Sequence, residues 1–180
     1  MRDKADAWQM EIASITWEFK KITKNLSSAN IQYKPAPNTW SIAENLSHLI
    51  QINSSYFPIF DQVLQETYSA TFLAQLPYVP DAIGQLLHRS MTSKIKMTTF
   101  RQWRPSENLD EMVPLFKDHQ MELSNYVQKL EPFVEKGTII HSPASRWLPY
   151  RLDQAIDTLV AHEKRHLNQC KNLIQVLPKK

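Results

Sequence analysis

The chain has 180 residues, among them 2 glycines, 11 prolines and 1 cysteine, and its formal net charge at pH 7 is +3. Dinucleotide fingerprints, phosphate-binding P-loops and the nucleophile elbow of serine hydrolases each need neighbouring glycines. Gly84 and Gly137 stand far apart, so these sites are excluded. The small positive charge argues against a dedicated polyanion-binding surface. This length and composition predict one helical domain over residues 1–180.

Two features predict a cytoplasmic location. Cys170 is the only cysteine, so an intrachain disulfide cannot form, as is usual in a reducing compartment. The charged residues 1–6 lack the apolar core of a secretory signal peptide. No apolar run approaches 18 residues, so we also expect no membrane-spanning segment.

Hydrophobic periodicity predicts two helices in the first third of the chain. Apolar residues recur every three or four positions from Trp8 to Leu26, which indicates one face of a first helix. A second helix is expected after Ser41, because Ser41 and Glu44 have the spacing of a capping box. Pro58 is expected to kink or stop this second helix.

Two more amphipathic segments follow after a long connection. A third helix is predicted from about Leu109 to Val134, and a fourth begins near Tyr150. The connection from about Pro77 to Pro105 is long for a bundle and is expected to hold a short helix over 82–89. Four stripes of similar length predict an all-α protein, a four-helix bundle with this long connection between helices two and three.

The fourth helix carries a pair of histidines, His162 and His166, one turn apart. On a helical wheel His166 lies within the apolar stripe and His162 lies at its edge, so both rings point toward the interior. Buried imidazoles need partners for their nitrogens. A shared divalent metal and ordinary hydrogen bonds to other side chains both meet that need, and spacing alone leaves the two interpretations open.

The string His162-Glu163-Lys164-Arg165-His166 matches the H-E-x-x-H pattern of zinc proteases. Two observations argue against a protease. The 14 residues after His166 contain no histidine, aspartate or glutamate as a downstream ligand, and the sequence offers no good strand to align a peptide. Glu163 could orient an imidazole or act as a base, but a carboxylate that reaches solvent or pairs with a lysine is the simpler interpretation.

A third metal ligand would have to come from upstream of His162. His119 lies on the apolar side of the third helix, where packing explains it, and His88 and His141 lie in connections where solvated rings are expected. His48 lies in the second helix, at the edge of its apolar stripe rather than at its centre. Geometry alone therefore does not select His48.

Two segments resemble the DinB-like superfamily, which includes YfiT-type metal-dependent hydrolases and thiol-dependent transferases. Residues 34–49 contain Trp40-Ser-x-x-Glu44 followed by His48-Leu49, similar to the signature that opens the family's second helix. The segment from Leu152 to Gln169, with His-x-x-x-His followed by glutamine, resembles the family's closing helix. The resemblance covers essentially the whole chain and implies the DinB-like four-helix bundle.

The resemblance also implies a metal site and a range of activities. The family's three metal-binding histidines match His48, His162 and His166. Three neutral imidazoles favour Zn²⁺ or Ni²⁺ over Mg²⁺ or Ca²⁺ and leave coordination positions open, as catalytic sites do. We therefore expect a metal-dependent enzyme acting on a small-molecule substrate, either a hydrolase or a transferase that uses a low-molecular-weight thiol as cosubstrate.

Two other functions compete with an enzyme. One is a bundle that binds a metal or a small ligand without turnover. The other is nucleic-acid binding, suggested by a stretch without acidic residues between Asp81 and Glu107, although a solvated connection explains that stretch more simply. Its basic residues are Arg89, Lys94, Lys96, Arg101 and Arg104.

One surface feature predicts a homodimer. Met10, Ala13 and Trp17 lie on the face of the first helix opposite its apolar stripe. Exposed large apolar side chains of this kind are enriched in protein interfaces. The alternative is that the connection from Pro77 to Pro105 covers them.

Overall fold

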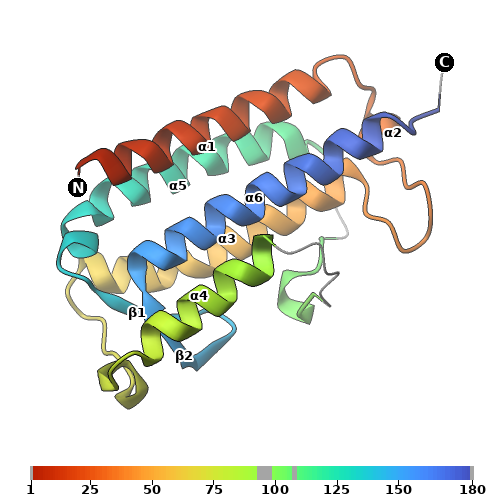
Figure 1. The fold of residues 1–180 in the computed structure, drawn as a ribbon. Helices are drawn as coiled ribbons and strands as arrows, with labels where there is room; N and C mark the ends of the chain where they lie inside the picture. The colour runs from red at the N-terminus through yellow and green to blue at the C-terminus, as the bar shows by residue number, and fades with distance from the viewer. Residues whose placement is uncertain (1, 93–98, 107–108, 179–180) are drawn as a thin grey trace.

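A computed structural model describes residues 2–92, 99–106 and 109–178. Its four long helices are α1 (Arg2–Thr23), α3 (Ile42–Leu64), α5 (Met112–Glu135) and α6 (Leu152–Ile174), which form the predicted four-helix bundle (Figure 1). The shorter elements are the helices α2 (Ser28–Ile31) and α4 (Val79–Thr92), the 3-10 turns η1 (Phe72–Gln75) and η2 (Arg101–Trp103), and the strands β1 (Ile139–Ser142) and β2 (Ser145–Arg151).

The caps and breaks of the helices follow local chemistry. The predicted capping box at the start of α3 is present, with the Ser41 side chain accepting from the Glu44 amide and the Glu44 carboxylate accepting from the Ser41 amide. Pro58 does not stop α3, which continues to Leu64. Gly137 has φ of +70° just after α5, where only a residue without Cβ adopts the left-handed conformation freely.

Contacts between side chains give the direction of each helix. Lys4 of α1 pairs with Asp153 of α6, and Glu18 pairs with Lys171, so α1 and α6 run parallel. Asn45 of α3 contacts His166 of α6, while Asn53, farther along α3, contacts the earlier residue Glu163. The helices α3 and α6 are therefore antiparallel.

Side-chain contacts also give the direction of α5 relative to α3. Phe57 stacks on His119, and Tyr126 donates to Asp61, so residue numbers rise together along α3 and α5. These two helices are therefore parallel. The connection between them has to return along the whole bundle, which explains its length and the path of α4 beside α6 (Figure 1).

Helix α4 packs against both α6 and β2. Gly84 lies at this contact, because a Cβ there would come within 2.0 Å of Oε1 of Gln154. That oxygen accepts from the amide of Arg151 at the start of α6. A side chain at position 84 would therefore displace the group that caps α6.

A β-hairpin connects α5 to α6 and corrects the expectation that the sequence offers no good strand. Strands β1 and β2 pair antiparallel, with Ile140 opposite Tyr150 and a tight turn at residues 143–144. Both partners are fully buried, and the Tyr150 hydroxyl bonds the Tyr56 hydroxyl of α3. The hairpin therefore closes one end of the bundle core rather than forming an open edge at the histidines.

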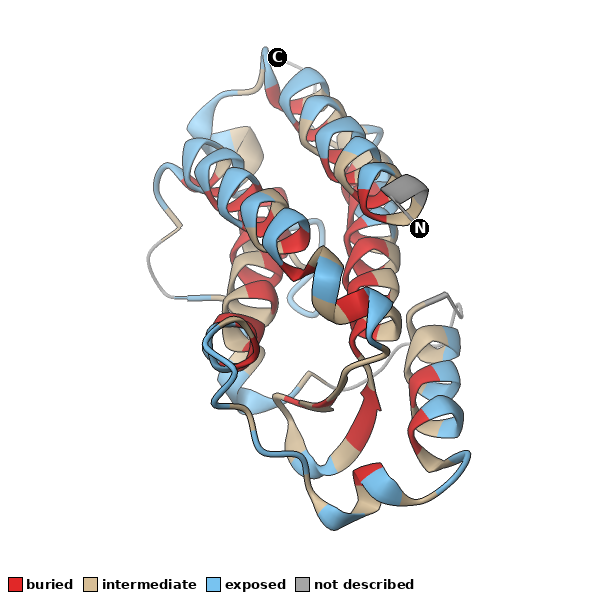
Figure 2. Ribbon diagram, turned by 90° about the vertical axis from the view of Figure 1, so that its left-hand side faces the viewer, coloured by how far each residue is buried: buried red, intermediate tan, exposed pale blue. Residues whose placement is uncertain are grey.

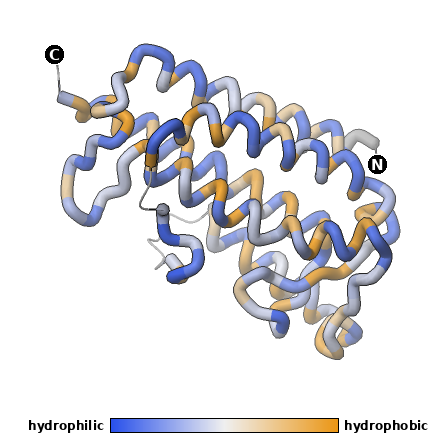
Figure 3. The backbone as a smooth tube through the Cα atoms, turned by 180° about the vertical axis from the view of Figure 1, so that it is seen from behind, coloured by the Kyte–Doolittle hydropathy of each residue, from blue (hydrophilic) through white to orange (hydrophobic). Residues whose placement is uncertain are grey.

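The core lies between the inward faces of the four long helices. Figure 2 shows buried positions along these faces and exposed positions outside, and hydropathy follows the same division (Figure 3). Among its largest fully buried side chains are Phe19, Phe60, Phe116 and Leu130. Among the helices that the structure describes, none is both long and apolar enough to cross a membrane.

Candidate metal centre

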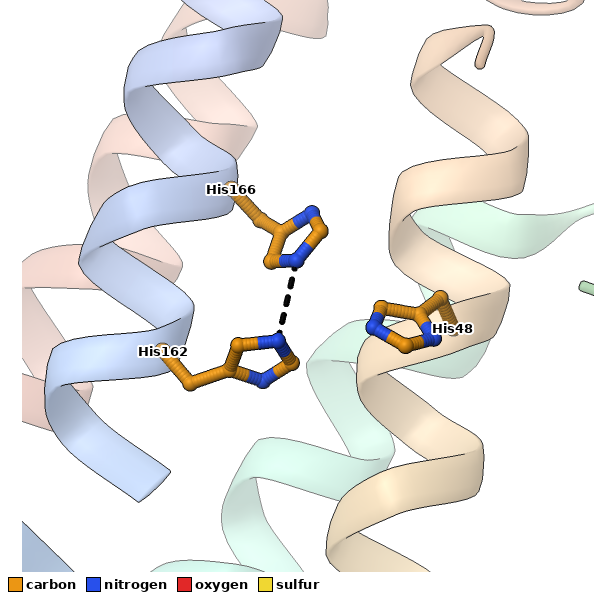
Figure 4. A group of neighbouring side chains, drawn as sticks. All are labelled: His48, His162 and His166. Carbon is orange, nitrogen blue, oxygen red and sulfur yellow. Dashed lines mark hydrogen bonds between the residues drawn. The ribbon is translucent and has the colours of Figure 1, made fainter. Parts of the chain in front are cut away.

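His162 and His166 project from adjacent turns of α6 toward α3 (Figure 4). Both side chains are buried, and their Nε2 atoms lie 3.0 Å apart. This arrangement agrees with the prediction that the two rings share one inward face of the fourth helix.

His48 approaches the same point from α3, on the opposite wall (Figure 4). Its ring centroid lies 5.1 Å from that of His162 and 4.9 Å from that of His166. Each of the three residues offers a ligand nitrogen, and these nitrogens all lie within 4.8 Å of one another. The structure thus brings together the three residues that the sequence resemblance selected, and metal binding by them stays a prediction.

Asn45 fixes the tautomer of His166. The Asn45 amide nitrogen donates to the carbonyl of Ser41 over 2.7 Å, which turns the amide oxygen toward His166. Nδ1 of His166 lies 2.7 Å from that oxygen and can only donate to it. The lone pair of the neutral ring is therefore on Nε2, the atom that faces His162.

The backbone of η2 fixes the tautomer of His48 in the same way. Nδ1 of His48 lies 2.6 Å from the carbonyl oxygen of Trp103 and donates to it. The lone pair of His48 is therefore on Nε2. Metal-binding histidines are held in this way, with one nitrogen donating to a carbonyl or side-chain oxygen so that the other can coordinate.

Burial keeps the three imidazoles neutral. Desolvation lowers the pKa of His162 to about 3 and brings the pKa of His166 well below its usual range. Desolvation also lowers the pKa of His48, partly opposed by its bond to the Trp103 carbonyl. Neutral rings have the lone pairs that a cation needs. Nδ1 of His162 is buried without a hydrogen-bond partner, in contrast to Nδ1 of the other two.

The remaining histidines lie away from this cluster. His119 is buried on α5 and stacks on Phe57 with ring centroids 5.2 Å apart, and burial lowers its pKa to about 4, so packing explains it as expected. His88 and His141 are not the solvated connection residues that we predicted. His88 lies on α4 and His141 on β1, and both are half-buried.

The prediction that the Glu163 carboxylate reaches solvent or pairs with a lysine is wrong. Its side chain is fully buried between α3, α5 and α6. Oε1 accepts hydrogen bonds from Asn53 over 2.7 Å and from Gln120 over 2.6 Å, while Oε2 has no partner. Burial raises the pKa of Glu163 to about 7 despite these two bonds. No bond joins it to a histidine within the described residues.

A cavity of about 670 Å³ opens beside the histidines. It lies between the segment before α3, the first half of α3, the end of α4, η2 and the second half of α6. His48, His162 and His166 line it, whereas Glu163 does not. The arrangement suits a cation held by three nitrogens at the wall of a space large enough for a small organic molecule.

Comparisons with known proteins identify the family and the fold of the chain. The sequence profile of the DinB superfamily matches residues 16–170. The chain belongs to the DinB superfamily. This membership confirms the resemblance that residues 34–49 and 152–169 indicated. No curated protein matches the sequence.

A solved structure of a DinB-like protein has the same fold. It is YfiT from Bacillus subtilis, described as a probable metal-dependent hydrolase with an unusual four-helix bundle topology. The superposition has a TM-score of 0.62 and 14% sequence identity, and it covers 97% of this chain and 88% of YfiT. The predicted DinB-like four-helix bundle is confirmed.

Proposed function

We propose that this DinB-superfamily protein is a divalent-metal-dependent enzyme that hydrolyses a small molecule. The observation that carries the proposal is the convergence of His48, His162 and His166 at the cavity wall, with Nδ1 of two rings held by acceptors. The description of YfiT as a probable metal-dependent hydrolase supports the same reaction type.

The donor set fits Zn²⁺ or Ni²⁺. Three neutral nitrogens are typical ligands of these ions, while Mg²⁺ and Ca²⁺ prefer oxygen. The Nε2 atoms of His162 and His166 lie only 3.0 Å apart, and with the His162 proton on Nδ1 a cation would accept a lone pair from each ring. A divalent ion with open positions supplies Lewis acidity and lowers the pKa of water.

A thiol-dependent transferase is the second candidate. Such a reaction needs a low-molecular-weight thiol from outside, because Cys170 is fully buried and burial raises the pKa of its thiol. A bundle that binds a metal or small ligand without turnover is the third, since no carboxylate among the described residues lines the cavity as a general base.

Elemental analysis of purified protein tests the metal site. We expect about one equivalent of zinc or nickel in the wild type and almost none in the double variant His162→Ala/His166→Ala. His119→Ala is the matched control, because it removes a buried histidine outside the cluster and should retain the metal. Equal metal content in the wild type and the double variant would overturn the proposal.

Two chromogenic probes test the reaction. With 4-nitrophenyl acetate, a hydrolase releases nitrophenolate without any thiol. With 1-chloro-2,4-dinitrobenzene, a transferase reacts only when a thiol such as cysteine is added, at a rate above the uncatalysed background. Turnover of both probes that is unchanged in the double variant would exclude the histidines from catalysis.

The expected partners and location stay predictions. A small-molecule substrate fits the cavity, and a cytoplasmic location rests on sequence alone. For nucleic acid, Arg89, Arg101 and Arg104 are exposed, while Lys94 and Lys96 lie outside the described residues. Retention on DNA that is weak and independent of salt would exclude nucleic-acid binding.

A further inference from the structure

The cavity beside the histidines is elongated along α6. On α6 its lining runs from His162 to Leu173, eleven positions that span roughly 16 Å at the rise of an α-helix. His162 and His166 lie at the start of this run, and on their other side the lining continues over His48 and Ile52 of α3 and over Phe100 and Trp103. A ligand that fills the cavity therefore has a part next to the histidines and a body that lies against the walls on either side of them.

The walls of the cavity beside the histidines are aromatic and aliphatic. Trp40 lies 4.7 Å from the ring of His48, so the aromatic surface begins at the histidines. Phe100 and Trp103 form a second aromatic wall on the α3 side, where the Trp103 carbonyl accepts from His48 and its indole donates to Ser55, and their ring centroids are 5.4 Å apart at 90°. Ile52 and Leu173 complete an apolar lining. Flat aromatic walls favour planar apolar groups, which stack or pack edge to face on them.

The described lining of the cavity has a positive charge and no negative charge. Among the described residues that line the cavity there is no aspartate or glutamate, and Arg165 is the charged residue. The sequence between Asp81 and Glu107, which supplies the wall at Phe100 and Trp103, contains no acidic residue. A ligand cation would leave water without a carboxylate to pair with, which is costly. A neutral group needs no counter-charge, and an anionic group has the positive charge of Arg165, whose Nη1 donates to the Ser90 carbonyl, in the same lining.

The structure assigns a substrate class to this cavity: a small molecule with a planar apolar portion and a neutral or anionic polar group. The planar portion lies against Phe100 and Trp103, and the polar group lies toward the histidines. This assignment rests on the proposed function only in taking the histidine end as the reacting end. The walls and charges that carry it are independent of a bound metal.

Calorimetric titration of metal-free protein in a chelating buffer tests the assignment without reference to activity. The probes are phenylacetate, phenylacetamide and phenylethylammonium, which share one ring and differ in charge. We expect the anion and the amide to bind at least tenfold more tightly than the cation. Cyclohexylacetate, which keeps the charge and loses the flat ring, should bind more weakly than phenylacetate.

Two variants locate the binding. Trp103→Leu removes the aromatic wall, and we expect it to weaken phenylacetate binding about tenfold. Phe100→Ala tests the same wall at a side chain that is 59% exposed, where folding is not at risk. Trp147→Leu is the matched control, because Trp147 is exposed on β2 and does not line the cavity.

Three outcomes would overturn the assignment. They are cation binding as tight as anion binding, no binding of any probe at millimolar concentration, and equal effects of Trp103→Leu and Trp147→Leu. Because the titrations use metal-free protein, they are independent of the metal analysis. If the metal analysis fails and the probes still bind in the expected order of affinity, the proposed enzyme is overturned and the proposed binding cavity stands.

Discussion

Asn45 and His166 are joined by a hydrogen bond of 2.7 Å from the ring Nδ1 to the amide oxygen, between the first turns of α3 and the middle of α6. The amide is itself oriented by the Ser41 carbonyl. The backbone at the start of α3 therefore determines which nitrogen of His166 is available for a cation. At the proposed metal site, Asn45 would orient a ligand without binding the ion itself.

Asn45→Ala should lower the affinity for Zn²⁺ by about 10- to 100-fold, because His166 loses the acceptor that holds its ring and tautomer. Competition with a chromogenic zinc chelator measures the affinity. Asn53→Ala is the control, since Asn53 is a buried asparagine on the same helix that bonds Glu163 instead of a histidine. An equal loss of affinity in both variants would indicate general damage to α3.

Removal of the metal should lower the melting temperature of the wild type. An ion that binds only the folded chain stabilises it by about 4 kcal/mol at a thousandfold excess over Kd. For a chain of this size we expect a fall of roughly 10 °C when a chelator is added. The double variant His162→Ala/His166→Ala should melt at the same temperature with and without chelator. A chelator effect that persists in the double variant would point to a different metal site.

Glu163 should make stability depend on pH. Burial raises its pKa to about 7 in the folded protein, against about 4.3 in an unfolded chain. The folded state holds the proton more tightly, so this stabilisation is complete below about pH 4 and is lost as the pH rises to about 7. Relative to Glu163→Gln, the wild type should lose on the order of 3 kcal/mol of unfolding free energy across that range.

Urea unfolding of both proteins at several pH values, with chelator present, measures this difference. The buried histidines have lowered pKa values, so their contribution has the opposite sign and is lost as the pH falls. Because both proteins contain these histidines, their contribution cancels in the comparison. A difference between the two proteins that does not change with pH would show that Glu163 stays in one protonation state.

The homodimer predicted from α1 stays a prediction that sedimentation can test. Met10 and Trp17 are 69% and 57% exposed, and the described parts of the long connection, residues 77–92 and 99–105, do not cover them. Trp17, together with the exposed Met121, lines a groove between α1 and α5. We expect a wild-type dimer and a monomeric Trp17→Glu variant, and a monomeric wild type would exclude the contact.

The helices of the bundle were predictable because the apolar residues within each of them recur with the period of an α-helix. The apolar stripe from Trp8 to Leu26 and the capping box at Ser41 need no information from the rest of the chain. The common face of His162 and His166 follows in the same way from their spacing. Local rules of this kind give element type and face, with boundaries that shift by a few residues, as in α5.

Pairings between helices were not predictable from local rules. The position of His48 opposite the other two histidines depends on the antiparallel register of α3 and α6, and only the family resemblance indicated it. The bonds from Asn53 and Gln120 to Glu163 join three helices, and no spacing within one helix reveals them. The signal available in the sequence was the position of Glu163 inside an apolar stripe. That position does not indicate which residues its carboxylate contacts.

The hairpin was missed for a different reason. Strand β1 has only four residues, and in β2 Pro149 and the exposed Trp147 interrupt the alternation that marks a half-buried strand. The pairing of Ile140 with Tyr150 is stabilised by burial at the end of the bundle core. That environment exists only after the helices have packed.

The place of Trp40 against two of the three histidines gives the protein an optical signal of its own. The indole lies 4.7 Å from the ring of His48 and stacks 6.0 Å from that of His166. An ion with unpaired d electrons, such as octahedral Ni²⁺ or Cu²⁺, quenches the fluorescence of an indole at this range. Zn²⁺, with a filled d shell, does not quench in this way. Because the chain has five tryptophans, the difference in emission between the wild type and Trp40→Phe isolates this indole and can distinguish the two classes of ion as they bind.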